Sequence, residues 1–454
     1  MRRRTTARSV APPASLPLRL YRLAVEHGGR WPLGSARAAR TGPPRVGYYV
    51  WRFPSLTGSC VQREVGALRQ AGVDVEVFAD IPERDELLDA EGRAFAGDTH
   101  YLLPTDAARL RAYRRRLLRS DPLGLVNALV YTALHRYAAY KNPREDLRIF
   151  QHALYLAGAV RERRVTHLHS PWANLSAFIA LLAARMAGVS YSVQARASAD
   201  LYRQRSRWAL AEKLAQARFV VTNSELNRAF IERFVPERRS IPIHVVYEGL
   251  DLSQFGAATK RTSAGEPMRI LSVGRLAEEK GFEHLLHALA LVRGRGRAFR
   301  CVIVGGADQA GYERELAELR GELRLDDVVS FTGALPFDRV RQEYARADVF
   351  VMSSVIARDG GRDVTPNALI EAMAMQLPVV ATRMMAIPEI VEDRVSGILV
   401  PPRNPHALAQ ALLELADDPI LAHQLGANAR RRVEDRFDIG KNVRRYVELF
   451  ASAS

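Results

Sequence analysis

Two acids, eight positions apart, stand in a segment whose residue types could bind a phosphorylated sugar. Asp363 precedes Pro366, which can open a helix because a missing N–H costs nothing in a first turn, and Thr365 is suited to cap it. Glu371 then lies about one and a half turns inside the helix. Because a helix N-terminus favours phosphate, the spacing predicts a nucleotide-sugar site. The alternative is a capping acid followed by an ordinary helix-face Glu.

This segment resembles the retaining glycosyltransferases of family four, which have the GT-B fold. The resemblance rests on the acid pair around Pro366-Asn367 and on the following run PVVAT…IPEIV…GILV. It implies that Asp363 touches the donor sugar and that Glu371 holds the ribose. The first acid is Asp363 where the family more often has Glu. The start of the expected helix should contribute further nucleotide-sugar contacts from Asn367, Ala368 and Leu369.

A second motif, Gly274 to Gly281, follows an expected strand and opens an expected helix, and it contains Arg275 and Lys280. Two cations at such a turn suit a diphosphate that gains charge as it leaves. The family has an Arg and a Lys in this frame, so the resemblance implies that Arg275, Lys280 and Asp363 are the catalytic residues. Solvated surface cations are the alternative. The nucleotide base is expected at the end of the Val328 strand, near Gly333 and Leu335.

The N-terminal half opens with a strand over Arg45–Trp51, a loop containing glycine, and a helix over Val61–Ala71. This order is typical of a Rossmann-like domain, and a loop glycine allows the backbone to approach a ligand closely. The family places the donor phosphate and the acceptor near this loop, so Thr57 and Gly58 are candidates. A simple turn at the start of a helix is the alternative.

Part of the N-terminal half resembles colanic-acid and lipopolysaccharide transferases but departs from them in the second of their two histidine patterns. His167-Leu-His169 matches their first histidine pattern, whereas Arg196 stands where they have a histidine. An Arg cannot act as a base, although it can hold a phosphate or an acidic sugar. His169 and Arg196 are therefore candidates on the acceptor side. For His169, a packed histidine at a strand end is the alternative.

Composition indicates an ordinary globular chain with an unusual charge distribution. The 454 residues carry a formal net charge of +16, and residues 1–45, with ten Arg and Glu26 as their only acid, supply +9 of it. A basic, Pro-rich lead of this kind is typical of disorder and lacks the apolar core of a secretory signal. The only cysteines, Cys60 and Cys301, lie far apart in the sequence, which argues against a disulfide framework and a cysteine metal site. We expect a cytoplasmic protein without a metal or other cofactor.

A basic segment beside an apolar one suggests a membrane surface element. Residues 107–119 hold six Arg and no acid, and residues 122–134 are nearly all apolar. Such a pair can bind an anionic leaflet, and this places the protein at the inner face of the membrane. A solvated face beside a core helix is the alternative. Nucleic acid is not expected as a partner because no recognition motif is present.

Together these features predict an α/β protein of the GT-B type, with two Rossmann-like domains facing a cleft and a helical C-terminus. The expected function is the transfer of a sugar from a nucleoside diphosphate to a lipid-linked or cell-surface glycan, with retention. A catalytically silent subunit of polysaccharide assembly is the main alternative; an epimerase of the same fold and a basic adaptor are weaker ones. The expected divisions are a lead at 1–44, an acceptor domain at 45–250, a linker at 251–267, a nucleotide-sugar domain at 268–435, and a returning helix at 436–454.

Overall fold

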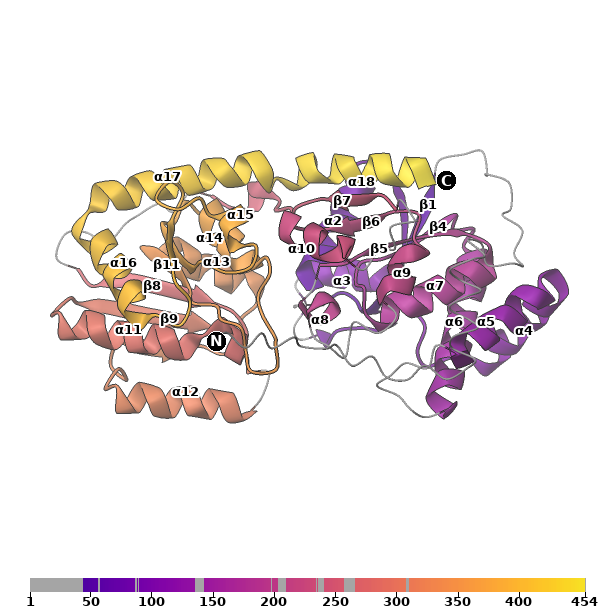
Figure 1. The fold of residues 1–454 in the computed structure, drawn as a ribbon, viewed down its shortest axis with the longest axis horizontal. Coiled ribbons are helices and arrows are strands. Elements are labelled where there is room, and N and C mark those ends of the chain that lie inside the picture. The colour runs from indigo at the N-terminus through magenta and orange to yellow at the C-terminus, as the bar shows by residue number, and fades with distance from the viewer. Residues whose placement is uncertain are drawn as a thin grey trace, which may run out of the picture.

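Two parallel β-sheets, one after the other along the chain, form the cores of two domains in the computed structural model (Figure 1). Thr57, residues 1–43 of the lead and residues 257–265 of the expected linker lie outside the described residues. The structure describes residues 44–55, 58–85, 88, 90–134, 143–196, 198–202, 210–233, 235, 241–256, 266–307 and 310–453.

The first sheet has the order β3-β2-β1-β4-β5-β6-β7, and every pairing in it is parallel. The order reverses between β1 and β4, which is where an open α/β sheet forms a ligand crevice. The strands are β1 (Arg45–Arg52), β2 (Asp74–Ile81), β3 (Thr99–Tyr101), β4 (His167–Ser170), β5 (Ser190–Gln194), β6 (Val220–Thr222) and β7 (Ile243–Val245).

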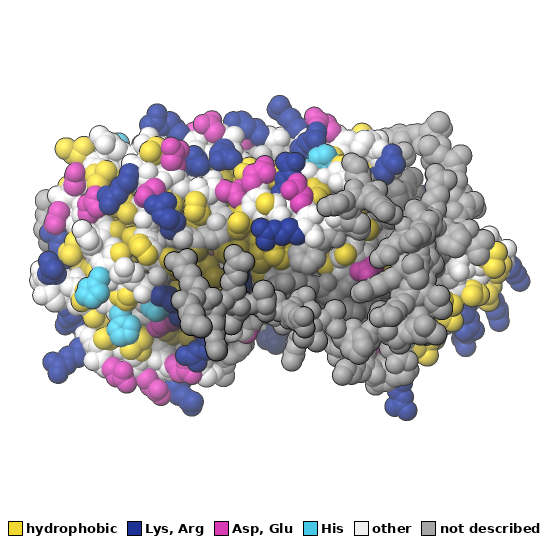
Figure 2. All heavy atoms as spheres, in the orientation of Figure 1, with side chains coloured by type: hydrophobic (Ala, Val, Ile, Leu, Met, Phe, Trp, Pro, Cys, Tyr) yellow, Lys and Arg dark blue, Asp and Glu magenta, His cyan; other side chains and the backbone are white. Residues whose placement is uncertain are grey.

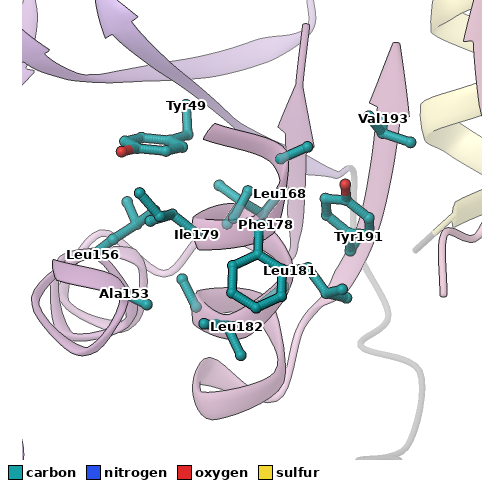
Figure 3. Packing of buried hydrophobic residues seen from close by; sticks show 14 of the residues in the cluster. Tyr49, Ala153, Leu156, Leu168, Phe178, Ile179, Leu181, Leu182, Tyr191 and Val193 are labelled. Carbon is teal, nitrogen blue, oxygen red and sulfur yellow. The ribbon is translucent and has the colours of Figure 1, made fainter. Parts of the chain in front are cut away.

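Helix α7 (Leu175–Ala187) fills the core of the first domain. It is apolar on nearly every side, and its N-cap is Asn174, whose side chain accepts a hydrogen bond from the Ser176 N–H. Figure 3 shows its side chains between those of α6 and those of the sheet. The other helices of this domain are α2 (Ser59–Gln70), α3 (Ala90–Gly97), α4 (Ala107–Ser120), α5 (Pro122–Leu134), α6 (Pro143–Glu162), α8 (Ser198–Leu201), α9 (Leu210–Ala215) and α10 (Glu225–Glu232).

The second sheet has the order β10-β9-β8-β11-β12-β13 and is also parallel throughout. This is the strand order of a dinucleotide-binding Rossmann domain. The expected α/β class with two Rossmann-like domains is therefore confirmed. The strands are β8 (Met268–Val273), β9 (Phe299–Val304), β10 (Val329–Phe331), β11 (Val349–Met352), β12 (Val379–Thr382) and β13 (Ile398–Val400).

The last helix of the chain returns to the first domain (Figure 1). The side chains of Val443, Tyr446, Leu449 and Phe450 in α18 (Ile439–Ala453) are buried among those of β1, β2 and α2. The second domain also contains α11 (Phe282–Gly294), α12 (Ala310–Glu322), α13 (Phe337–Arg346), α14 (Asn367–Ala374), α15 (Ile387–Ile390), α16 (Pro405–Asp417), α17 (Pro419–Arg436) and the 3-10 turns η3 (Leu252–Gln254) and η4 (Glu278–Lys280).

The two connections between the domains run side by side. The Leu250 N–H donates to the Phe437 carbonyl at 2.7 Å, and the Ile439 N–H donates to the Leu250 carbonyl at 3.0 Å. A Cβ added at Gly249 would lie 2.5 Å from the Ile439 side chain, so only glycine allows the two segments to approach this closely. The chain thus passes between the domains in two adjacent segments, one around Leu250 and one around Asp438, which are hydrogen-bonded to each other.

Candidate active site between the two domains

Three loops that follow parallel strands meet at one edge of the second sheet. Gly274 follows β8, Gly305 follows β9, and Gly333 lies beyond β10; the Gly305 N–H donates to the Gly333 carbonyl at 3.0 Å. A Cβ on Gly305 would lie 1.8 Å from the Gly274 carbonyl oxygen, whereas one on Gly333 would meet nothing within 4 Å. Glycine at 305 is therefore needed for packing, and Gly333 borders open space. Leu335 packs partly buried against the second core.

Lys280 and Asp363, both singled out in the sequence, lie in direct contact. Lys280 Nζ is 2.9 and 2.8 Å from the two Asp363 carboxylate oxygens, and the Ser354 hydroxyl donates to Oδ2 at 2.8 Å. The two charged side chains are only 13 and 16% exposed. Gly281 turns the chain after Lys280 with φ of 62°, and a Cβ there would lie 2.2 Å from the Ser353 carbonyl. The structure thus places a cation and an acid, 83 residues apart, at one point of this edge.

Arg275 directly follows Gly274 at the same edge. Its guanidinium Nη2 is 2.9 Å from Glu279 Oε1, and its side chain remains 44% exposed. Glu279 is mostly buried, so the Arg275 guanidinium pairs with a carboxylate on the protein side. The structure therefore presents Arg275 at the surface of the edge, beside the turn that carries Lys280.

Glu371 lies within α14 and has partners from both domains. Its Oε1 accepts from Nη1 of Arg63 in the first domain at 3.2 Å. Its Oε2 lies 3.2 Å from the Tyr344 hydroxyl, which is also 3.1 Å from the Ala368 carbonyl. Sequence reasoning found Glu371 but missed Arg63, because no local pattern distinguishes this Arg on α2.

The start of α14 differs from the expected one. The helix begins at Asn367 with Pro366 as its N-cap, and Thr365 does not cap it. The Thr365 hydroxyl instead accepts from Asn223 Nδ2 of the first domain at 2.6 Å. Asn367 Oδ1 is buried and has no hydrogen-bond partner in the described part of the chain. Ala368 is half-buried. The structure does not bring Leu369 to the crevice, because its side chain is fully buried in the second core.

Further contacts hold the domains together near these residues. The Glu389 carboxylate accepts from the backbone N–H groups of Glu225 and Leu226 at 2.9 Å each, at the N-terminus of α10. An acid at this position is favoured by the helix dipole. The Arg362 guanidinium lies 4.9 Å from the centre of the Tyr202 ring. The described residues thus show the two domains in contact across the site.

Arg196 is directed into the first domain. It is 4% exposed, and its guanidinium nitrogens lie 3.2 Å from Glu64 and 3.3 Å from Glu248. The indole of Trp172 lies 5.1 Å from the guanidinium carbon. Burial raises the pKa of Glu64, and the charge of Arg196 opposes that rise. The Arg196 guanidinium is thus occupied by two buried carboxylates and is not presented to the cleft.

His169 is a packed histidine with no exposed surface. Its Nδ1 lies 2.7 Å from the Ser192 hydroxyl, and its ring centre is 4.9 Å from that of Tyr48 and 5.5 Å from that of Phe450 on α18. Burial holds its pKa well below the usual range, so the ring is neutral. The structure does not bring His169 to the acceptor side.

Gly58, the other candidate near the first strand, lies at the N-cap of α2. Its N–H donates to the Ser55 carbonyl at 3.1 Å.

Comparison with known proteins identifies the family. Residues 267–418 match the family model described as glycosyl transferases group 1. A GDP-mannose-dependent α-(1-6)-phosphatidylinositol monomannoside mannosyltransferase of Mycobacterium tuberculosis is 30% identical over 297 residues, which cover 60% of this chain and 74% of that protein. The chain belongs to the group 1 glycosyltransferases.

One further relative and one solved structure extend the likeness over nearly the whole length of this glycosyltransferase. The amylovoran biosynthesis glycosyltransferase AmsK of Erwinia amylovora is 27% identical over 428 residues, covering 89% of this chain and 98% of AmsK. The structure of HepE from Anabaena in complex with UDP-glucose superimposes with a TM-score of 0.67 at 16% identity, covering 90% of this chain and 99% of HepE. The fold is therefore the GT-B fold.

Proposed function

We propose that this group 1 glycosyltransferase transfers a sugar from a nucleoside diphosphate to a glycan acceptor in polysaccharide assembly, with retention of configuration. The observation that carries the proposal is the contact between Lys280 and Asp363 at the edge where the strands of the second sheet end. Strand ends of an open α/β sheet are where such folds bind nucleotides. AmsK, an amylovoran biosynthesis glycosyltransferase, and HepE, solved with UDP-glucose, support the reaction class.

Each charged residue binds a different part of the donor. Arg275 and Lys280 bind the diphosphate, because a guanidinium fork and an ammonium both stabilise phosphate oxygens that gain charge. Asp363 orients Lys280 and accepts hydroxyls of the donor sugar. Glu371 accepts ribose hydroxyls, and the base lies near Gly333 and Leu335. With these cations in place, we propose that the reaction uses neither a metal nor another cofactor.

The bond changes follow from this arrangement. The bond between the anomeric carbon and the diphosphate oxygen breaks, and the acceptor hydroxyl oxygen bonds to that carbon from the same face. The acceptor proton passes to the departing phosphate oxygen. Two features of the first domain support a route without a side-chain base: Arg196 cannot accept a proton, and His169 is fully buried.

Turnover with a panel of nucleotide sugars and isolated lipid-linked oligosaccharides tests the proposal. We expect one donor to be consumed and NMR of the product to show the anomeric configuration of the donor. A product of inverted configuration would exclude retention. Binding of a nucleotide sugar with neither transfer nor hydrolysis would favour the second candidate function.

That second candidate is a catalytically silent subunit that binds nucleotide sugar during polysaccharide assembly. The observation favouring it is Arg196, which stands at a histidine position of similar transferases and is engaged by Glu64 and Glu248 inside the first domain. Turnover by the wild type separates the two candidates. An active wild type would exclude the silent subunit, whereas a wild type that binds a nucleotide sugar without turnover would support it.

We further propose that the acceptor is reached at the inner, anionic face of a membrane. All six Arg of α4 are exposed, and Leu118 lies on the same outer arc as Arg111, Arg114 and Arg115. Leu123, Val126, Leu129 and Val130 of the adjacent α5 are between 44 and 56% exposed. Six of the eleven exposed large apolar side chains in the described chain belong to α4, α5 and α6.

The space-filling view supports this surface. Figure 2 shows apolar side chains flanked by Lys or Arg at the end of the molecule where Figure 1 places α4 and α5. A basic helix beside an exposed apolar stripe fits an anionic lipid interface, where each cation contributes about 1 kcal/mol. No helix in the described residues is long and apolar enough to cross a membrane.

Vesicle flotation tests this part of the proposal. We expect binding to vesicles containing phosphatidylglycerol and not to pure phosphatidylcholine, with loss at high salt. Replacing Arg111, Arg114 and Arg115 by Gln should abolish it, whereas replacing the exposed Arg314, Arg358 and Arg394 of the second domain should not. Equal binding by both triple variants would contradict this assignment.

A further inference from the structure

Arg63 of the first domain contacts the second domain, and two of its three guanidinium nitrogens make no hydrogen bond in the described part of the chain. It lies in the second turn of α2, 308 residues from its partner Glu371, and only its Nη1 bonds, at 3.2 Å. Its Nε and Nη2 are buried and have no hydrogen-bond partner in the described part of the chain. Buried polar groups are rarely left unpaired, and a charged one requires an explanation.

The two unused nitrogens form one edge of the guanidinium. The N–H bonds of Nε and Nη2 are parallel, and this pair is the fork that binds two oxygens of a carboxylate or a phosphate at once. The remaining edge is the one that holds Glu371. Arg63 can therefore keep its contact with Glu371 while it binds an oxyanion.

The surroundings indicate which oxyanion. The inference rests on the proposed function, in which Glu371 accepts the ribose hydroxyls of the donor. In a nucleotide the diphosphate is attached to that same ribose, so a cation touching Glu371 lies within one sugar of the phosphates. Asn367 Oδ1, one helical turn before Glu371 on the same face, is also buried and unpaired in the described residues. Unused donors and an unused acceptor on the two sides of Glu371 suit a ligand that carries phosphate oxygens and hydroxyls.

We propose that Arg63 binds the donor diphosphate through Nε and Nη2 and is the first domain's contribution to the donor site. The bound nucleotide then bridges the two domains, because Glu371 and Lys280 hold it from one side and Arg63 from the other. The hydrogen bond between Arg63 and Glu371 then also has a positioning role, because it holds the Nε and Nη2 donors of Arg63 in place before the donor binds.

Calorimetric titration of Arg63 variants tests this assignment with two ligands, the nucleoside diphosphate that binds the wild type and its parent nucleoside. The nucleoside has the ribose but no phosphate. For Arg63→Gln we expect the dissociation constant of the diphosphate to rise roughly ten- to hundredfold, as for a lost charged hydrogen bond, and that of the nucleoside to stay within about threefold. Arg63→Lys, which keeps the charge and loses the fork, should fall between Gln and wild type.

Arg69→Gln is the matched control. Arg69 lies on the same helix but pairs with Asp98 and the Val75 carbonyl inside the first domain, so both dissociation constants should be unchanged. An unchanged diphosphate affinity in Arg63→Gln, or equal losses for diphosphate and nucleoside, would overturn the assignment while leaving the donor site in place. Failure of the wild type to bind any nucleoside diphosphate would overturn the proposed function itself.

Discussion

The two domains use buried charge in opposite ways. In the second domain, Lys280 and Asp363 pair at the end of the sheet, where both retain some exposure, and Arg275 beside them is 44% exposed. In the first domain, Arg196 lies between Glu64 and Glu248, and all three residues are less than 9% exposed. The charges at the sheet end of the second domain are thus accessible to a ligand, whereas Arg196, Glu64 and Glu248 of the first domain satisfy one another.

The returning helix explains much of this difference. Tyr446 and Val443 of α18 line the same small cavity as Glu64, Arg196 and Glu248. In the described part of the chain, a Cβ on Gly333 in the glycine loops of the second sheet would meet nothing within 4 Å. Charged residues near a strand end therefore become binding residues only where the rest of the chain leaves them accessible.

The largest expected effect is on the stability of the first domain. Arg196→Met would leave Glu64 and Glu248 buried without their cation, and breaking a buried pair in this way costs about 3–5 kcal/mol. Urea unfolding measures this loss. Arg228→Met is the control, because its pairs with Glu225 and Glu232 are exposed and should change the free energy of unfolding by about 0.5 kcal/mol or less. Equal losses in the two variants would remove the distinction between the domains.

In the second domain the matching substitution should affect turnover more than folding. Lys280→Met removes the cation assigned to the leaving diphosphate, and we expect kcat to fall about 10²- to 10³-fold. Unfolding free energy should change by less than in Arg196→Met, because Asp363 keeps the Ser354 hydroxyl and partial contact with water. Steady-state kinetics and urea unfolding of one preparation give both values. Full activity in Lys280→Met would contradict its assigned role.

A pH dependence of stability should come from the buried histidines of the first domain. Burial lowers the pKa of His167 to about 3 and holds that of His169 well below its usual range. Since the unfolded chain takes up these protons near pH 6.5 and the folded one does not, each histidine costs stability as the pH falls below about 6.5. For His167 the loss continues toward its folded pKa of about 3. The slope is about 1.4 kcal/mol per pH unit for each histidine.

His167→Gln isolates this contribution. The slope of unfolding free energy against pH between 6 and 4 should decrease by about 1.4 kcal/mol per unit relative to wild type. A slope identical to that of the wild type would show that His167 takes up its proton in the folded protein.

The smallest effect is expected at a single contact between the domains. Thr365→Val removes the hydroxyl that accepts from Asn223, and one such hydrogen bond contributes about 1 kcal/mol. Asn223 keeps its bond to Glu248 at 3.0 Å, which limits the loss. A loss above about 2 kcal/mol in urea unfolding would mean that Thr365 supports the cleft more widely than this one contact.

The site residues of the second domain were predicted from the sequence better than those of the first domain. The two motifs located Lys280 and Asp363, which the structure brings together. The short strands β3 and β13 were missed, whereas the equally short β10 was expected from the β-branched and aromatic residues that follow Val328.

The contacts between domains could not be predicted. Arg63, Asn223 and Glu389 each meet a residue more than 140 positions away in the other domain, and nothing in their local sequence marks them. Arg196 and His169 show the reverse case. Their residue types suggested a ligand, but their surroundings, which depend on α18 and on neighbouring strands, make them internal.

The most direct test of the account is thermal unfolding of the wild type with nucleoside diphosphates at moderate salt, with Glu371→Gln beside it. A diphosphate at about one hundred times its dissociation constant should stabilise the wild type by about 2.7 kcal/mol. We expect a shift with one base, and a smaller shift for Glu371→Gln at the same concentration. No shift with any nucleoside diphosphate would contradict a donor site at the Lys280–Asp363 edge.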